Sequence, residues 1–206
     1  MRKWITVAAA AVLVGMIAQP VAAQMRLGIH AGAVNSKFTG NGINNTKSRL
    51  GFMAGAQLGF ELHENFGIAI GANYVMAGAD SVTFAPGDPG ADISMSYIDV
   101  PLTFMGVIQA TPAFRVGPYI GVQAGLKMSC SSGAAGGSLT TCPDDTAKSL
   151  VVAIPAGVGF GWAVGESGMI VIDARFNLGV TKAFETTEAK NQYWQLMLRY
   201  SFAIGG

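Results

Sequence analysis

The sequence is poor in charge. Only 12% of its 206 residues are Asp, Glu, Lys or Arg, about half of the usual quarter. A charge-poor chain that is 50% hydrophobic does not have the composition of a disordered protein. The formal net charge is +1 and the basic residues form no cluster, so we expect no nucleic-acid partner.

The sequence also lacks a long apolar run. The longest N-terminal run, residues 4–18, is shorter than the roughly 20 apolar residues that a membrane-spanning helix needs. Two basic residues precede it and small residues follow it, which predicts a cleaved secretory signal peptide over residues 1–23 rather than an anchoring helix. Cleavage between Ala23 and Gln24 leaves one domain, residues 24–206.

Cysteine is scarce as well. Cys130 and Cys142 are the only two in the chain, and two thiols are too few for a structural zinc site. An exported chain meets an oxidising compartment, so we predict that these cysteines form a disulfide. In the chain-entropy model a bridge across such a short loop contributes about 3 kcal/mol.

Glycine, by contrast, is abundant, with 28 residues, roughly twice the usual share. The glycines have no three-residue period, which excludes a collagen-like chain. They alternate with large apolar residues in eight segments, and a period of two is typical of β-strands. In one such segment the apolar face carries Ile170, Ile172, Ala174, Phe176, Leu178 and Val180, and the other face carries Val171, Asp173, Arg175, Asn177, Gly179 and Thr181.

The connections between these segments alternate in length. Long connections are expected at 36–47, 79–91, 129–147 and 182–190, and short turns at 63–65, 111–113 and 165–168. Outer-membrane barrels have short periplasmic turns and longer external loops. The pattern therefore predicts an all-β fold, an eight-stranded antiparallel up-and-down transmembrane β-barrel with both termini periplasmic.

The composition of the two strand faces predicts their orientation. The glycine-containing face is too poor in charge for the exterior of a soluble barrel, so we expect the large apolar face to meet lipid. The inward glycines suit the narrow interior of eight strands. Two interfacial aromatic girdles are expected, one with Phe60, Phe66, Phe104, Phe114, Trp162 and Phe202 at the turn end, and one with Phe38, Tyr74, Tyr97, Phe184 and Trp194 at the loop end.

Charged residues on the inward face predict a polar network in the lumen. A buried ion must be paired or it costs several kcal/mol, and we expect Asp99, Asp173, Arg175 and Arg199 to pair near mid-barrel and plug the lumen. The alternative is a cation-lined channel for anions. The full predicted network consists of Arg49, Asp99, Arg115, Asp173, Arg175 and Arg199, with Lys127 and Glu61 also facing inward.

No arrangement of residues points to an enzyme. His30 and Asp99 are expected in the lumen, with Ser94 and Ser96 nearby, but no catalytic motif surrounds them and a filled lumen offers a substrate no access. We therefore expect no catalytic residues and no cofactor. Five aspartates in the expected loops suit calcium, but without EF-hand spacing they are explained equally well as turn residues, so no metal site is assigned. These are Asp80, Asp88, Asp92, Asp144 and Asp145.

Several short motifs resemble the PorT-like outer-membrane β-barrel domain family. They are Gly28-Ile29-His30-Ala31-Gly32, Gly51-Phe52-Met53-Ala54-Gly55, Glu64-Asn65-Phe66-Gly67-Ile68 and Tyr97-Ile98-Asp99-Val100-Pro101-Leu102. The resemblance covers essentially the whole mature chain. It implies a single barrel of about eight strands, and a few members of this family are linked to protein secretion.

The C-terminal pattern Leu196-x-Leu198-x-Tyr200-x-Phe202 resembles the signal read by the outer-membrane assembly machinery, although the chain continues to Gly206. We therefore expect an integral protein of the outer membrane, with membrane lipid and this machinery as partners. Its role is predicted to be structural or binding, through external loops that contact a partner, such as a protein, or a surface. Two alternatives remain, a narrow passive pore and a soluble, lipocalin-like periplasmic carrier of an apolar ligand.

Overall fold

The computed structural model describes residues 24–143, 146–185 and 187–204. The predicted signal peptide lies outside this part of the chain, and its cleavage site falls at the boundary. Within the described residues, no helix has the length and apolar character needed to cross a membrane.

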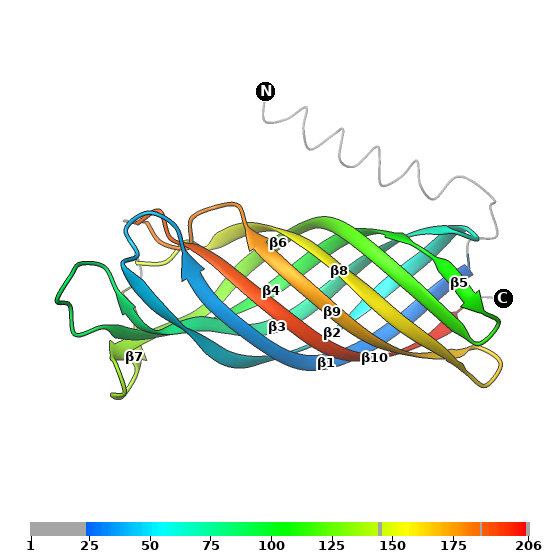
Figure 1. Ribbon diagram of the computed structural model, residues 1–206, viewed down its shortest axis with the longest axis horizontal. Coiled ribbons are helices and arrows are strands. Elements are labelled where there is room, and N and C mark those ends of the chain that lie inside the picture. The colour runs from blue at the N-terminus through cyan, green and yellow to red at the C-terminus, as the bar shows by residue number, and fades with distance from the viewer. Residues whose placement is uncertain (1–23, 144–145, 186, 205–206) are drawn as a thin grey trace, which may run out of the picture.

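The described chain is a single antiparallel sheet rolled into a barrel (Figure 1). Two of its ten strands are short: β5 continues the line of β4 beyond Val107, and β7 pairs with the end of β6. The other eight form the wall, as predicted. The strands are β1 (Gln24–Thr39), β2 (Asn45–His63), β3 (Phe66–Thr83), β4 (Ala91–Gly106), β5 (Ile108–Thr111), β6 (Phe114–Ala134), β7 (Thr140–Thr141), β8 (Leu150–Val164), β9 (Gly168–Gly179) and β10 (Lys190–Ile204).

Closure of the barrel joins β1 to β10 and β4 to β6. The row of paired residues that starts at His30 reaches Gly125 of β6 in one direction around the barrel. In the other direction it reaches Arg115 of the same strand, ten residues away. This ten-residue offset is the shear of the barrel. Together with the spacing between strands, it corresponds to a strand tilt of about 40° and a radius of about 8 Å. Such a barrel has a lumen just wide enough for side chains.

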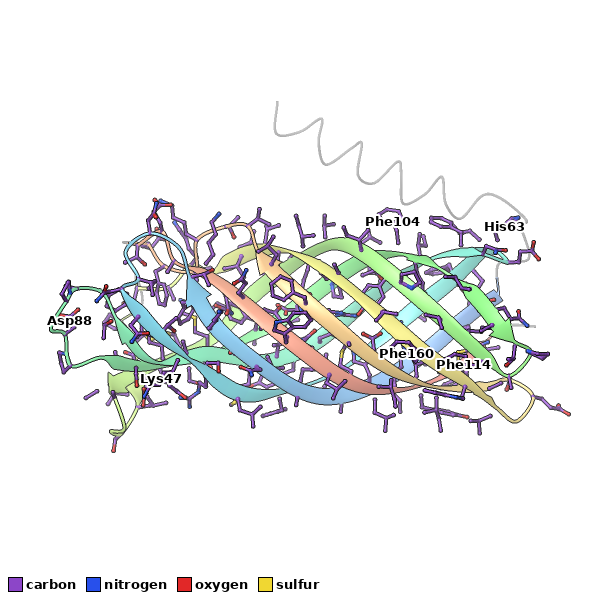
Figure 2. All side chains as sticks on the ribbon, in the orientation of Figure 1. Lys47, His63, Asp88, Phe104, Phe114 and Phe160 are labelled. Atoms are coloured by element: carbon purple, nitrogen blue, oxygen red, sulfur yellow. A yellow bond between two sulfur atoms is a disulfide. The ribbon has the colours of Figure 1, made fainter. Side chains whose placement is uncertain are left out.

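The large apolar side chains point outward, as predicted. On β10, Leu196, Leu198 and Tyr200 are 60%, 61% and 43% exposed, while Tyr193 and Met197 on the opposite face are buried. Figure 2 shows such side chains all over the outer wall, Phe104 and Phe160 among them. An exposed apolar surface of this kind is incompatible with a water-soluble carrier, because it has to be covered by lipid.

Aromatic rings mark two levels on the outer wall. At the turn end Phe114 packs on Trp162, with ring centroids 5.1 Å apart. On β10, Trp194 and Phe202 lie eight residues apart, which places the two levels about 20 Å apart along the barrel axis. The loop-end girdle consists of two packed pairs, Phe52 with Tyr74 and Phe176 with Trp194.

Three aromatic residues predicted for the loop-end girdle lie elsewhere. Phe38, Tyr97 and Phe184 are all buried, and Phe38 packs edge-on against Phe184 with centroids 5.0 Å apart. Phe38 and Tyr97 occupy inward positions of their strands, and Phe184 lies in the connection between β9 and β10. These rings form the core of a cap over the loop end instead of contacting lipid.

Three of the four long connections are shorter than predicted, because the strands continue beyond the apolar band. The fourth, predicted at 182–190, begins earlier instead, since β9 ends at Gly179 and β10 begins at Lys190. The first connection was expected at 36–47, but β1 runs to Thr39 and β2 begins at Asn45. Likewise, β3 runs to Thr83 and β6 runs to Ala134. Outside the hydrocarbon layer the paired backbone no longer requires alternation of apolar and small residues, so the sequence pattern ends before the strand does.

Candidate functional site in the lumen and at the loop end

The middle of the lumen is crossed by a cluster of charged and phenolic side chains. Asp173 is buried and accepts a hydrogen bond from the Tyr119 hydroxyl. The Arg199 guanidinium lies on the same carboxylate, with Nη2 3.3 Å from Oδ2. Arg175 Nε donates to the Tyr119 hydroxyl oxygen at 3.0 Å, and its guanidinium lies 5.3 Å from the centre of the Tyr119 ring. Four side chains from β6, β9 and β10 thus form one connected layer.

Glycine makes room for this layer. A Cβ at Gly157 would lie 2.5 Å from the Tyr119 hydroxyl and 2.7 Å from its Cζ atom. A Cβ at Gly28 would lie 3.0 Å from Arg199 Cδ. The inward glycines therefore admit the few large side chains that cross the lumen.

A second polar cluster surrounds Asp99, closer to the loop end. Asp99 Oδ2 accepts hydrogen bonds from Gln123 Nε2 at 2.8 Å and from the Tyr193 hydroxyl at 2.6 Å. Gln123 Nε2 also lies 2.6 Å from the Tyr193 oxygen. Asp99 is buried, and its carboxylate is held by neutral donors rather than by an arginine.

The network predicted from the sequence is larger than the cluster that forms at mid-barrel. Of the six residues expected in one network, Asp173, Arg175 and Arg199 meet at mid-barrel, and Asp99 belongs to the separate Gln123 and Tyr193 cluster. The two remaining arginines lie near the ends of the barrel. Arg49 pairs with Asp80 at 2.6 Å at the loop end, and Arg115 lies 3.7 Å from Glu61 at the turn end.

The residues that sequence reasoning missed are neutral. Tyr119 bonds to Asp173, whereas Gln123 and Tyr193 bond to Asp99. Asn73 holds His30 through a contact of 2.7 Å to Nε2. Each of them occupies an inward position of its strand. The alternation alone therefore identifies them as lumen residues, although not as partners of particular charges.

The residues weighed as a catalytic group are not brought together. His30 bonds to Asn73, whereas Asp99 bonds to Gln123 and Tyr193. Ser96 shares a hydrogen bond of 2.6 Å with Ser129 on the neighbouring strand. Each group is thus engaged in a different contact.

Aspartates at the loop end organise the backbone. Asp88, at the tip of the β3–β4 hairpin (Figure 2), accepts hydrogen bonds from the N–H groups of Phe84 and Ala85. Asp92 accepts from the N–H groups of Gly136 and Ser81, both at 2.8 Å. These bonds lower the pKa of the Asp92 carboxyl below its ordinary value, the bond from Gly136 contributing most.

Metal ligands are not clustered at the loop end. Asp144 and Asp145 lie outside the described residues, and within the described part of the chain no three metal-ligating side chains gather.

A cap closes the loop end. Its core includes Phe38, Met95, Tyr97 and Phe184, packed with both cysteines. The connections that follow β6 and β9 pair with each other, since the Lys148 N–H donates to the Ala183 carbonyl at 2.9 Å and Ala147 forms a bridge with Phe184. Lys127 Nζ donates to the Ala147 carbonyl at 2.8 Å. The full cap core consists of Phe38, Ala79, Val82, Ile93, Met95, Tyr97, Cys130, Cys142, Ala147, Ala183, Phe184 and Ala189.

The cysteines form the predicted disulfide. Cys130 and Cys142 are joined, with their Cα atoms 5.4 Å apart, and the Cys142 N–H donates to the Cys130 carbonyl at 3.0 Å. The bridge fixes the base of the β6–β7 hairpin, which projects from the barrel (Figure 1). Beside it lies a cavity of about 320 Å³, whose walls include Phe84, Ile93, Ser132, Cys142, Thr146 and Phe184.

Comparisons with known proteins agree with this architecture. The chain aligns over 86% of its length with 97% of the crystal structure of Neisserial surface protein A, at 16% identity and a TM-score of 0.52. It aligns over 87% of its length with 99% of a major outer membrane protein from Thermus thermophilus, at 12% identity and a TM-score of 0.54. For outer membrane protein W of E. coli the coverage is 88% and 98%, the identity 10% and the TM-score 0.51.

These structural similarities show the fold, and a match to a sequence family shows the family. No curated protein matches the sequence. Residues 17–185 match the family described as outer membrane protein beta-barrel domain. Because this match covers most of the sequence, the chain belongs to the outer membrane protein beta-barrel domain family.

Proposed function

We propose that this protein is a non-enzymatic outer-membrane barrel with a plugged lumen, and that it acts by binding a protein partner through its external loops. The proposal places the function at the capped loop end. A partner in protein secretion, as the PorT-like resemblance implies, is one such partner.

Closure of the lumen is supported by the mid-barrel layer. Across a lumen of eight strands, Tyr119 bonds to both Asp173 and Arg175, and Asp173 pairs with Arg199. A cavity of about 90 Å³ lies on the turn side of this layer, and one of about 20 Å³ beside Asp99 lies on the loop side. A solute passing between them would have to break the Tyr119 and Asp173 contacts.

Binding at the loop end is supported by the cavity beside the disulfide, and this observation carries the proposal. Its wall is mainly apolar, with Phe84, Ile93 and Phe184, and it also includes the hydroxyl-bearing residues Ser132 and Thr146. Phe84 is 43% exposed at the hairpin that reaches furthest from the barrel. An apolar cavity with a few polar groups in its wall suits an apolar side chain of a protein partner.

Site-specific photo-crosslinking on intact cells tests the proposal. A photoreactive residue is placed at Thr146 or Ser132 in the cavity wall, and a control is placed at Leu198 on the lipid face. We expect one discrete protein adduct from both cavity positions and none from Leu198. Equal labelling from all three positions, or no protein adduct from the cavity, would contradict loop-mediated binding.

A further inference from the structure

The turn end of the lumen contains a cavity of about 90 Å³. Arg26, Arg115, Arg199 and Glu61 line it together with inward glycines and a mainly apolar wall that includes Met105 and Met169. At Gly59 an added Cβ would have only the Arg26 carbonyl oxygen within 4 Å, at 3.8 Å. Since about 15 Å³ of such volume holds one water, the cavity has room for several waters or for one small anion.

Positive charge exceeds negative charge around this cavity. Arg199 is balanced by Asp173, which leaves Arg26 and Arg115 to share the Glu61 carboxylate. Arg26 Nε lies 4.0 Å and Arg115 Nη1 lies 3.7 Å from the same oxygen, Glu61 Oε1. Both separations exceed the 2.7–3.2 Å of an N–H···O hydrogen bond. One carboxylate therefore lies between two guanidinium groups without bonding directly to either.

Arg26 is held in place with one donor unused. Its Nη2 donates to the Ser167 carbonyl at 3.0 Å, which fixes the side chain against the β8–β9 turn. Its Nε is buried and has no hydrogen-bond partner among the described residues. The Arg26 side chain is 16% exposed, compared with 34% for Arg115. A buried guanidinium donor without an acceptor is costly. Since Nε has almost no accessible surface, an anionic oxygen would satisfy it once the Arg26 side chain turns toward the cavity.

We infer that this cavity is a binding site for a small oxyanion that enters from the periplasmic side, with Arg26 and Arg115 as its ligands. Guanidinium groups bind phosphate and carboxylate through paired N–H donors. The site lies at the opposite end of the barrel from the external loops, so it does not depend on the proposed loop function.

The test uses the folded full barrel in a non-ionic detergent, because a phosphocholine detergent would itself supply phosphate. Sodium phosphate and sodium acetate are titrated separately at constant ionic strength, and NMR follows the Nε–Hε groups of Arg26 and Arg115 and the amide of Gly59. We expect saturable shifts confined to this end of the barrel. The two titrations distinguish a phosphate site from a carboxylate site.

Variants separate binding from a merely structural ion pair. Arg26→Gln and Arg115→Gln should each weaken binding about tenfold, the equivalent of about 1.4 kcal/mol. Glu61→Gln removes the competing carboxylate and should strengthen binding about fivefold, the equivalent of about 1 kcal/mol. Lys37→Gln, which removes a cation at the far end of β1, should leave the affinity unchanged.

Two outcomes would overturn the inference. One is a set of shifts that grow linearly without saturation, or that appear equally at both ends of the barrel. The other is an affinity that Glu61→Gln fails to raise while the variant still shows the heat-modifiable gel migration of a folded barrel. Because Glu61→Gln keeps both arginines, this second result is informative even if an arginine variant does not fold.

Discussion

Replacement of Arg199 by methionine should destabilise the barrel strongly, because it removes the ion-pair partner of the buried Asp173. The side chain of Asp173 is 1% exposed and that of Arg199 is 11% exposed. At their 3.3 Å separation and an effective dielectric constant of 20, the Coulomb attraction is about 5 kcal/mol. Breaking a buried pair by removing one partner typically costs about 3–5 kcal/mol, and we expect a loss in this range for Arg199→Met.

The assay is urea unfolding of the protein refolded into phospholipid vesicles, followed by the fluorescence of Trp162 and Trp194 in the two girdles. Adding Asp173→Asn to Arg199→Met should restore at least about 1.5 kcal/mol of unfolding free energy, because the unpaired charge is then absent. The control is Arg49→Met at the half-exposed loop-end pair, with an expected loss of about 0–1 kcal/mol. Equal losses for Arg199→Met and Arg49→Met, without rescue by Asp173→Asn, would refute the buried pair.

Three further predictions concern the loops and the lipid face. Replacing Cys130 and Cys142 by serine should expose the β6–β7 hairpin to proteolysis while heat-modifiable migration persists, and loss of that migration would contradict a role confined to the loop. Because the pKa of Asp92 is lowered in the folded protein, the contribution of Asp92 is present above the ordinary aspartate pKa and is lost as pH falls through the lowered value. Amide exchange of the β6–β7 hairpin, which contains Gly136, should therefore accelerate as pH falls below the ordinary aspartate pKa of about 4. Asp92→Asn should remove this dependence, so an unchanged profile would argue against it. Leu198→Arg, midway between the girdles, should cost about 2–4 kcal/mol in vesicles, whereas Gln192→Arg near the loop end should cost about 0–1 kcal/mol, and equal costs would contradict the assigned membrane depth.

The wall of the barrel was predictable because, within the hydrocarbon layer, a side chain that faces lipid must be apolar and one that faces the narrow lumen is mostly small or polar. Alternation along β9 and β10 assigns Ile172 and Leu198 to lipid and Asp173 and Arg199 to the lumen. The structure confirms this, since the first two side chains are exposed, Asp173 is buried and Arg199 is largely buried. The girdle expectation, in contrast, misplaced Phe38, although alternation along β1 puts it on the inward face with His30. Beyond the apolar band inward positions no longer indicate a narrow lumen, and this ring is covered by the cap instead.

The partners inside the lumen were not predictable, because they depend on the shear of the barrel. His30 contacts Asn73 two strands away, and Asp173 contacts Tyr119, also two strands away. Which inward residues share a level is set by the ten-residue shear, and alternation along a strand carries no information about that number. The cap likewise depends on contacts between loops that are distant in the sequence, such as Ala147 with Phe184.

Single-channel recording in planar bilayers tests the central claim, a membrane-embedded barrel whose lumen is closed, most directly. Insertion is first verified by heat-modifiable migration of the vesicle-bound protein, so that an absence of current can be interpreted. We expect the current recorded from the wild-type protein to show no stable openings at either polarity. Stable openings of uniform conductance would contradict this claim and identify the protein as the narrow passive pore.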